Sequence, residues 1–357
     1  MIAINAQAKP IHTNLLPWFD EHGRHDLPWQ IDKSPYPVWI SEIMLQQTQV
    51  STVIPYYERF LNTFPSVTDL AAAPLDDVLH LWTGLGYYAR ARNLHQAAKQ
   101  VVDRYQGNFP DSLDELQTLP GIGRSTAAAI LSICHQQPTA ILDGNVKRVL
   151  ARYHAIEHWT GDTKLQQQLW ALAQYHTPDK RAGDYTQAIM DLGATICRRR
   201  KPSCLLCPIE EHCQAAAKGL TEKLPIAKPK KHIPLKQVTL TLIRNSKGEI
   251  FLQKRPPSGV WGGLWSLPEK QSIASELAGL AKQPCDTLET ILHTFSHFRL
   301  EITPEVYQLD TTRAQTLFAV MEANETVWYN INQPAQTLGL AAPIKKLLQQ
   351  YANKVHL

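Results

Sequence analysis

The sequence lacks the features that mark membrane, secreted and disordered proteins. No apolar run approaches the roughly 20 residues of a membrane span, so we expect no membrane partner. Residues 1–20 show no basic stretch followed by an apolar one, so we expect no secretory signal and a reducing, cytoplasmic location. Hydrophobic residues make up 44% and charged residues 19% of the 357 positions, which excludes disorder. We therefore expect a globular chain of two or three domains.

Cysteine is scarce outside one short segment. Four of the six cysteines follow the spacing C-x6-C-x2-C-x5-C, at Cys197, Cys204, Cys207 and Cys213. Four thiolates so close together can surround one metal centre. A zinc ribbon usually has two C-x2-C pairs and only one is present, which favours a [4Fe–4S] cluster over zinc. Arg199 and Arg200 belong to a basic run between the first two cysteines, which is either a solvated face or a contact for duplex phosphates.

Strand signals are sparse before residue 218. Apolar residues recur at helical spacing in residues 70–82, 89–105 and 123–135. Residues 218–236 then combine three prolines with several lysines, which predicts a stiff linker. We therefore predict an all-α region over residues 1–217.

Strand signals appear after the linker. Residues 238–243 and 249–253 flank the turn 245–248 and predict a hairpin, and residues 325–329 predict a later strand. The fold class we predict is multidomain, an all-α region followed by an α+β domain over residues 237–357.

The segment Leu119–Gly123 predicts a tight turn between two helices. Ser112 and Glu115 have capping-box spacing ahead of it, and helical spacing resumes after it. Gly121 and Gly123 carry no Cβ, so backbone N–H groups there can approach a phosphate closely. An ordinary helix connection is the alternative for a lone Gly-x-Gly. With helices on both sides and the cysteine segment downstream, we favour a helix–hairpin–helix.

Two carboxylates stand in unusual surroundings. Glu42 lies among large apolar side chains, where burial would raise its pKa and favour the protonated form. Asp143 stands at the expected start of a helix, where the dipole favours the charged form. Carboxyls whose environments push their pKa values apart can serve as acid and anion in one site. Taken singly, each could be an exposed helix residue or a plain N-cap.

Together these segments resemble the adenine DNA glycosylases of the MutY family, in the endonuclease III superfamily, over essentially the whole chain. The matching segments in order are Trp29, Glu42, Met44–Gln49, Gly84–Tyr88, the hairpin, Asp143–Val146 and the four cysteines. The resemblance implies a six-helix subdomain over about 30–137, an iron–sulfur subdomain from 1–29 with 138–217, and a Nudix-like recognition domain over 237–357.

The resemblance also implies a reaction and a partner. Adenine opposite 8-oxoguanine or guanine would be flipped out of double-stranded DNA and its N-glycosidic bond hydrolysed by a monomeric enzyme. Glu42 would protonate the base and Asp143 would stabilise the sugar cation, with Asn145 beside them. Gln46, Gln47 and Tyr87 would insert at the lesion. The implied DNA-binding residues are Trp29, Gln46, Gln47, Tyr87, Gly121, Gly123, Ser125, Arg199 and Arg200.

One missing residue separates this interpretation from a bifunctional alternative. Relatives such as endonuclease III carry a lysine just after the hairpin, and its amine attacks the sugar as a Schiff-base nucleophile. Ser125 stands in that place, and a hydroxyl cannot form an imine. We therefore expect a monofunctional glycosylase that leaves an abasic site.

The C-terminal region resembles Nudix hydrolases but lacks their metal ligands. Residues 261–268 resemble the stretch before the Nudix catalytic helix, whereas 269–280 lack its arginine and glutamate cluster, which argues against nucleotide hydrolysis. By family resemblance, Phe295, Ser296 and His297 would read 8-oxoguanine. A catalytically inert mismatch-binding protein is a further alternative, although binding alone needs neither Glu42 nor Asp143.

Overall fold

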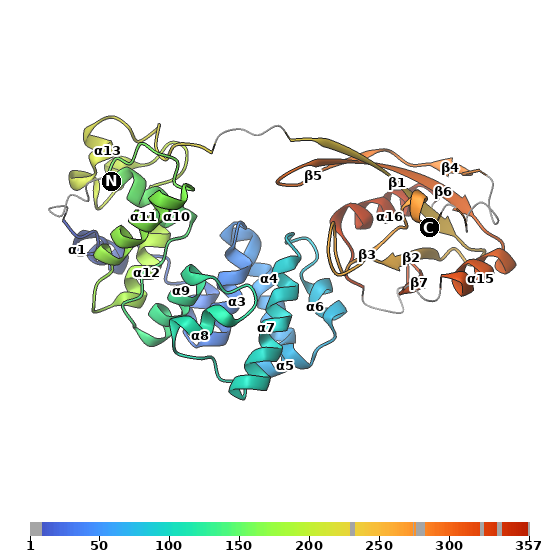
Figure 1. Cartoon of the computed structure of the whole chain (residues 1–357), viewed down its shortest axis with the longest axis horizontal. Coiled ribbons are helices and arrows are strands. Elements are labelled where there is room, and N and C mark those ends of the chain that lie inside the picture. Colours follow the sequence, from blue (N-terminus) through green and yellow to red (C-terminus); the bar gives the residue numbers. More distant parts are fainter. Residues whose placement is uncertain are drawn as a thin grey trace. The chain divides into compact units, whose positions relative to one another are not determined.

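The computed structural model describes residues 9–228, 233–273, 275, 283–321, 325–333 and 338–355. The chain forms two compact units. The first combines the residues up to 71 with 96–230, and the second combines 72–95 with 231–357. The first is helical and the second contains the β-sheet (Figure 1). This confirms the predicted fold class, an all-α region followed by an α+β domain.

The first unit consists of helices joined by short loops. They are α1 (His12–His22), α2 (Pro28–Ile31), α3 (Pro35–Leu45), α4 (Val50–Thr63), α5 (Val67–Ala72), α8 (Leu113–Thr118), α9 (Arg124–His135), α10 (Gly144–Tyr153), α11 (Thr163–His176), α12 (Ala182–Asp191) and α13 (Gln214–Ala217), with a π-helix η1 (Leu192–Ile196) and two 3₁₀ turns, η2 (Cys204–Leu206) and η3 (Glu210–His212). Helices α6 (Leu75–Leu81) and α7 (Ala89–Tyr105) begin in the second unit, and α7 ends in the first.

Helix α9 lies at the centre of the first unit. It packs against α3, α8 and α12, and all its residues from Thr126 to Ile133 are buried. The three alanines in this stretch allow neighbouring helices to approach closely. Ser132 and Thr186 link α9 to α12 through a buried hydroxyl contact of 2.9 Å. The start of α9 is thereby held rigidly where it meets the site described below.

Two local predictions need correction. Residues 70–82 form the end of α5 and the whole of α6 instead of one continuous helix, because Pro74 lacks an N–H and adopts an extended backbone with ψ 140°. At the predicted capping box, the Ser112 hydroxyl accepts the Glu115 N–H as expected. The Glu115 carboxylate, however, accepts that hydroxyl's proton at 2.7 Å instead of reaching back to the backbone.

The second unit contains a mixed seven-stranded sheet in the order β3-β2-β1-β6-β4, with β5 paired to β6 and β7 to β2. Strands β1 and β6 are parallel and every other pair is antiparallel. The predicted hairpin is β1 and β2, and the predicted later strand is β7. The strands are β1 (Leu235–Arg244), β2 (Ile250–Lys254), β3 (Trp265–Ser266), β4 (Asp286–Thr287), β5 (Ile291–Thr294), β6 (Arg299–Gln308) and β7 (Thr326–Tyr329).

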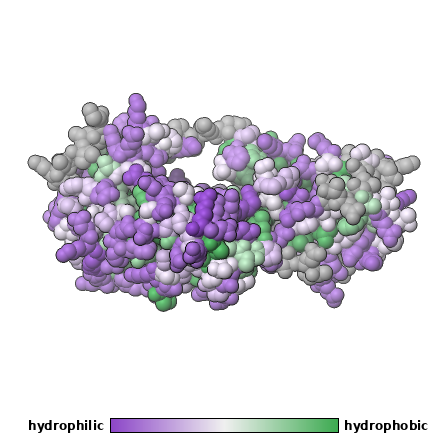
Figure 2. All heavy atoms as spheres, turned by 60° about the horizontal axis from the view of Figure 1, so that its bottom comes forward, coloured by the Kyte–Doolittle hydropathy of each residue, from purple (hydrophilic) through white to green (hydrophobic). Residues whose placement is uncertain are grey.

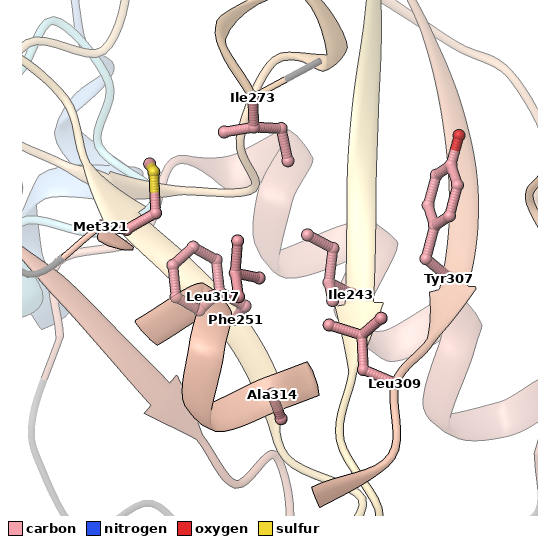
Figure 3. Close-up of a cluster of buried hydrophobic side chains, with 8 residues drawn as sticks. All are labelled: Ile243, Phe251, Ile273, Tyr307, Leu309, Ala314, Leu317 and Met321. Carbon is pink, nitrogen blue, oxygen red and sulfur yellow. The ribbon is translucent and has the colours of Figure 1, made fainter. Parts of the chain in front are cut away.

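Helices α15 (Thr311–Val320) and α16 (Ala342–Lys354) and the 3₁₀ turn η4 (Lys270–Ile273) complete the second unit. A hydrophobic cluster joins α15 to the sheet (Figure 3). In it, Ala314 and Leu317 from α15 meet Ile243 from β1 and Phe251 from β2. Burial of such side chains stabilises a fold by about 1.5–3 kcal/mol each.

Parts of two sequence predictions fall on residues outside the described ranges. Of residues 269–280, only 269–273 and 275 are described. Of the predicted linker, 229–232 are not described. Within the described part of the linker, Leu224 is buried and β1 already begins at Leu235.

The face seen in Figure 2 is mostly hydrophilic, with hydrophobic residues in small areas between the polar ones. Leu205 and Leu206, between two of the four cysteines, are among the large hydrophobic residues that are exposed. Within the described residues, no helix is both long and apolar enough to cross a membrane.

Candidate active site

A pocket of about 950 Å³ opens in the first unit. Its walls come from α2, α3, α9 and α10 and from the end of α12. The structure therefore brings together, from distant parts of the sequence, seven of the residues that the sequence predicted for catalysis or DNA binding. They are Trp29, Glu42, Gln46, Gln47, Ser125, Asp143 and Asn145.

Glu42 lies on α3 with apolar neighbours on both sides. Ser41, Ile43 and Met44 are buried, whereas the Glu42 carboxyl faces the pocket. Burial, with a smaller contribution from the negative charge of Asp143, raises the pKa of Glu42 to about 8. Among the described residues, no hydrogen-bond donor or cation contacts this carboxyl. Glu42 is therefore protonated at neutral pH, as the sequence predicted, and can act as a general acid.

Asp143 caps α10. Its Oδ1 accepts the Val146 N–H at 2.8 Å, and the residue lines the pocket. Burial raises the pKa of Asp143, and the amides of Val146 and Asn145 and the cation of Arg148 lower it in part. The helix start thus lowers the pKa of Asp143 as the sequence predicted, but desolvation outweighs this effect and the net shift is upward.

Asn145 holds the first turn of α10 against η1. Its Oδ1 accepts from Arg148 Nη2 at 2.8 Å, and the same nitrogen donates to the Gly193 carbonyl at 2.6 Å. A Cβ at Gly193 would come within 2.6 Å of Asn145 Cβ, so only glycine allows this approach. A π-helical turn such as η1 is a frequent feature of functional sites.

The predicted hairpin joins α8 to α9. Gly121 has φ +80°, a left-handed conformation that glycine adopts without strain. Gly123 is the N-cap of α9 with an ordinary φ of −88°, and a Cβ there would meet no atom within 4 Å. The fold itself therefore does not require glycine at position 123, whereas a ligand approaching the N-terminus of α9 would need that space.

Ser125 lies in the first turn of α9 and lines the pocket. Its Oγ accepts the N–H of Leu142 at 3.0 Å. Leu142 is buried and directly precedes Asp143, so this hydrogen bond satisfies a buried donor and fixes the chain that leads into the carboxylate.

Sequence reasoning missed two polar pairs, each with at least one residue that lines the pocket. Arg24 forms two side-chain hydrogen bonds to Asp191 Oδ1, and its backbone N–H donates to Oδ2 at 2.8 Å. Asp191 is 1% exposed and ends α12. Gln30 Nε2 donates to Gln187 Oε1 at 3.2 Å, and both amides are buried. These residues are single polar side chains in α2, in α12 and in the loop after α1, and no spacing pattern distinguishes them.

The four cysteines line one small cavity in the first unit with Arg152 and Tyr153 of α10. All four are free thiols. Over the described part of the chain, no group of three or more His, Cys, Asp or Glu side chains is arranged to hold a single metal ion. The side chains of Arg199 and Arg200 are exposed between the first two cysteines, as the sequence suggested.

Two arginines of α10 connect this cysteine loop to the pocket. Arg148 Nε donates to the Cys197 carbonyl at 2.8 Å. Arg152, one turn later and 1% exposed, donates to the carbonyls of Arg198 and Leu224 at 2.7 and 2.9 Å. No sequence pattern marks either arginine for this role. Through Arg148 and Arg152, one face of α10 contacts the cysteine loop. Asp143 caps the start of the same helix.

Two residues expected to insert into DNA have strained backbones. Gln47 has φ +59° in the first unit and Tyr87 has φ +51° in the second. Tyr87 is 50% exposed although it is aromatic. Left-handed conformations of non-glycine residues are uncommon and concentrate at functional sites. Trp29, in contrast, is buried against Tyr57, so it can meet only a base that enters the pocket.

Phe295, Ser296 and His297 form the turn between β5 and β6. The Phe295 N–H donates to the Phe298 carbonyl at 2.9 Å and the two rings stack at 4.5 Å. Ser296 and His297 are exposed at the tip, 3.3 Å apart between Oγ and Nδ1. Their side chains are accessible on a turn whose base is fixed by aromatic packing.

Family comparisons agree with this geometry. The model for the HhH-GPD superfamily base excision DNA repair protein matches residues 40–174, and the NUDIX domain model matches residues 239–350. The first match spans Glu42, the hairpin and Asp143. The fold and the pocket thus define a helix–hairpin–helix DNA glycosylase of base excision repair, a hydrolase that acts on DNA.

Similar proteins identify the family. The chain is 39% identical to the adenine DNA glycosylase of Buchnera aphidicola subsp. Acyrthosiphon pisum, over 96% of this chain and 97% of that protein. It is 36% identical to the adenine DNA glycosylase of Homo sapiens, over 85% of this chain and 67% of that protein. The chain belongs to the adenine DNA glycosylase family. Its similarity to these glycosylases supports a monofunctional DNA glycosylase.

Solved structures resemble the helical part. A thermostable thymine-DNA glycosylase superimposes with a TM-score of 0.51 and 27% identity, over 58% of this chain and 94% of that one. Endonuclease III in a non-covalent DNA complex gives a TM-score of 0.50 with the same coverage, and its 23% identity supports the fold alone.

Proposed function

We propose that the enzyme removes adenine opposite 8-oxoguanine or guanine from double-stranded DNA and leaves an abasic site. The observation that carries this proposal is the pairing of Glu42 and Asp143 in one pocket, each with a raised pKa and each supplied by a different helix. A protonated carboxyl beside a second carboxyl is the arrangement needed to cleave a glycosidic bond.

Glu42 donates its proton to a ring nitrogen of the flipped adenine, which makes the base a neutral leaving group. Asp143 Oδ2 faces the sugar carbon, where it stabilises the developing cation or forms a transient covalent bond to it. Once ionised, Glu42 accepts a proton from water, which adds to the sugar carbon and yields the abasic site. Asn145 keeps the α10 turn, and with it Asp143, in place.

Ser125 offers no amine for a Schiff base. Its hydroxyl instead accepts the Leu142 N–H next to Asp143. Strand cleavage by a lyase step is therefore not part of the proposed reaction.

The proposed DNA contacts are of two kinds. Gly121, Gly123, Arg199 and Arg200 offer backbone N–H groups or guanidinium groups to phosphates, which position a duplex without reading its sequence. Gln46, Gln47 and Tyr87 enter the base stack, where a nucleotide must be replaced once adenine leaves it. Ser296, framed by Phe295 and His297, hydrogen-bonds the oxidised guanine.

We further propose that Cys197, Cys204, Cys207 and Cys213 hold a [4Fe–4S] cluster. A four-iron cluster takes one thiolate per iron and needs a cage wider than a single ion requires, and four thiols around one cavity fit that demand. A cluster bound there would hold the cysteine loop, with its flanking arginines, in one rigid shape. Arg152 Nη1 donates a hydrogen bond to the Cys197 sulfur at 3.3 Å.

One assay tests the reaction. The full chain is incubated with duplexes containing adenine opposite 8-oxoguanine, guanine or thymine, with and without later alkali. We expect adenine release from the first two, with strand breaks only after alkali. Strand breaks without alkali would show a lyase step, and equal release opposite thymine would refute the mispair proposal.

A further inference from the structure

The second unit holds Tyr87 and the Phe295–His297 turn in one compact body. Within it, Arg92 of α7 has an unusual environment. Its guanidinium is half-buried, and burial lowers its pKa. Among the described residues no carboxylate pairs with it, and its one hydrogen bond runs from Nη1 to the Gly262 carbonyl at 2.6 Å. Burying a cation that gains only one carbonyl partner costs folding free energy. The contact is therefore a candidate for a functional role.

Gly262 belongs to a tightly closed loop between β2 and β3. Gly263 N–H donates to the Arg255 and Pro256 carbonyls at 3.2 and 3.0 Å, and a Cβ at Gly262 would lie 2.5 Å from the Pro257 carbonyl oxygen. Trp261 in this loop has φ +54°, a conformation that a bulky side chain adopts only when its surroundings enforce it.

The Trp261 ring carries the next contact. It is 8% exposed and lies 5.9 Å from the Phe295 ring and 6.0 Å from the His293 ring, between centroids. Phe295 and His293 pack edge to face at 4.6 Å. Trp261 thus supports the base of the turn whose tip carries Ser296.

On its other side, Arg92 is linked to the segment that carries Tyr87. The Arg90 N–H donates to the Tyr87 carbonyl at 2.8 Å and the Arg92 N–H to the Tyr88 carbonyl at 3.1 Å, so Arg92 lies in the first turn that follows the exposed tyrosine. The Tyr88 hydroxyl donates to the Leu340 carbonyl at 3.3 Å, which ties the same segment to the sheet domain a second time.

We propose that Arg92 is a positioning residue for opposite-base specificity: by holding Gly262 it fixes Trp261 beneath the Ser296 turn and joins that turn to the segment carrying Tyr87. The inference rests on the proposed reading of 8-oxoguanine by Ser296. Arg92 is not among the residues that line the Glu42 pocket, so it acts on which base is accepted opposite adenine and leaves bond cleavage unchanged.

The test uses the full chain and single-turnover adenine release opposite 8-oxoguanine and opposite guanine at one salt concentration. Arg92→Ala should lower the ratio of the two rates by about 5- to 20-fold, within the range of coupling through packed networks, and chiefly by slowing the 8-oxoguanine duplex. Arg104→Ala is the matched control, since Arg104 is exposed near the end of the same helix. Trp261→Ala should act like Arg92→Ala, and Arg92→Lys, which keeps a donor, should retain part of the ratio.

Ser296→Ala separates failure of this inference from failure of the proposed function. If Arg92 acts through the turn, Arg92→Ala combined with Ser296→Ala should lower the ratio no further than Ser296→Ala alone. Ser296→Ala could lower the ratio of the two rates while Arg92→Ala and Trp261→Ala, both folded, keep the wild-type ratio. That result would overturn only the positioning role of Arg92. Normal ratios in all three would overturn both proposals. Equal slowing of both duplexes by Arg92→Ala, with weaker salt dependence, would identify a phosphate contact instead.

Discussion

Arg152 Nη1 donates to Cys197 Sγ at 3.3 Å, from a guanidinium that is almost completely buried. The same side chain donates to the carbonyls of Arg198, Arg199 and Leu224. A cysteine of the proposed metal-binding loop is therefore joined to α10, the helix that Asp143 caps.

Arg152→Lys should destabilise the fold and weaken the cysteine loop. Lysine has one ammonium in place of a planar fork, so at least two buried carbonyls would lose their partner, at about 1–3 kcal/mol each. We expect a lower melting temperature and fewer irons per chain, measured by thermal denaturation and metal analysis. Arg200→Ala, which removes an exposed side chain, should change neither. Unchanged iron content and melting temperature in Arg152→Lys would contradict this account.

Glu42→Gln should abolish most of the activity. General acid catalysis typically contributes about 10²–10⁴-fold, and the amide cannot donate the same proton. Because the pKa of Glu42 is raised to about 8, the wild-type single-turnover rate should fall as pH rises through that value. It should also fall at low pH, where Asp143 becomes protonated. A rate that stays level from pH 7 to 9.5, or a loss of less than threefold in the variant, would exclude Glu42 as the acid.

We expect Asp143 to combine its helix-cap role with the proposed catalytic role, and different substitutions can separate the two. Asparagine is a good N-cap, so Asp143→Asn should keep the Val146 hydrogen bond and the stability while losing the anion and the activity. Asp143→Ala should lose the activity as well and also about 1 kcal/mol of stability. Paired measurements of urea denaturation and adenine release check this. An active Asp143→Asn enzyme would reduce Asp143 to a helix cap.

A buried histidine pair should make the protein sensitive to acid. His176 Nδ1 accepts the Ile11 N–H at 3.1 Å, so His176 Nε2 carries the ring proton and donates it to His154 Nε2, 2.8 Å away between the nitrogens. Burial lowers the pKa of His176 to about 3 and that of His154 to about 4. Between pH 6.5 and about 4, both histidines are protonated in the unfolded chain but stay neutral in the folded chain. The free energy of unfolding therefore decreases as pH falls.

We expect the melting temperature to drop by about 5–10 °C over that interval. His154→Gln, which can still accept from His176, should reduce the slope, whereas His22→Gln at an exposed position should leave it unchanged. A flat profile between pH 6.5 and 4 in the wild type would contradict the neutral buried pair.

The sequence predicted those parts of the site whose chemistry depends on spacing. Glu42, Asp143, Ser125 and the hairpin glycines were all identified, because apolar flanks, cap positions and turn glycines leave local signals. The pocket confirms that Glu42, Ser125 and Asp143 converge, and the roles in catalysis and binding stay predictions.

The remaining parts depend on tertiary contacts. Arg24 and Asp191 lie far apart in the sequence, and only folding makes them a pair. The upward net pKa shift of Asp143 likewise reflects desolvation by neighbouring helices, which no local pattern reports. Pro74 was a local signal for the break in the helix expected over 70–82. The apolar residues at helical spacing on both sides of Pro74 nevertheless favoured one continuous helix.

The apolar setting of Glu42 has a consequence for the order of events in a catalytic cycle. Burial favours the protonated form of this carboxyl, so in the proposed mechanism the free enzyme already holds the proton that the reaction consumes. After transfer, a bare negative charge remains among apolar side chains and opposite Asp143. That intermediate is the least stable form of the active site, and recapture of a proton from water relieves it. Water entry to the pocket is therefore part of resetting the catalyst, in addition to supplying the attacking oxygen.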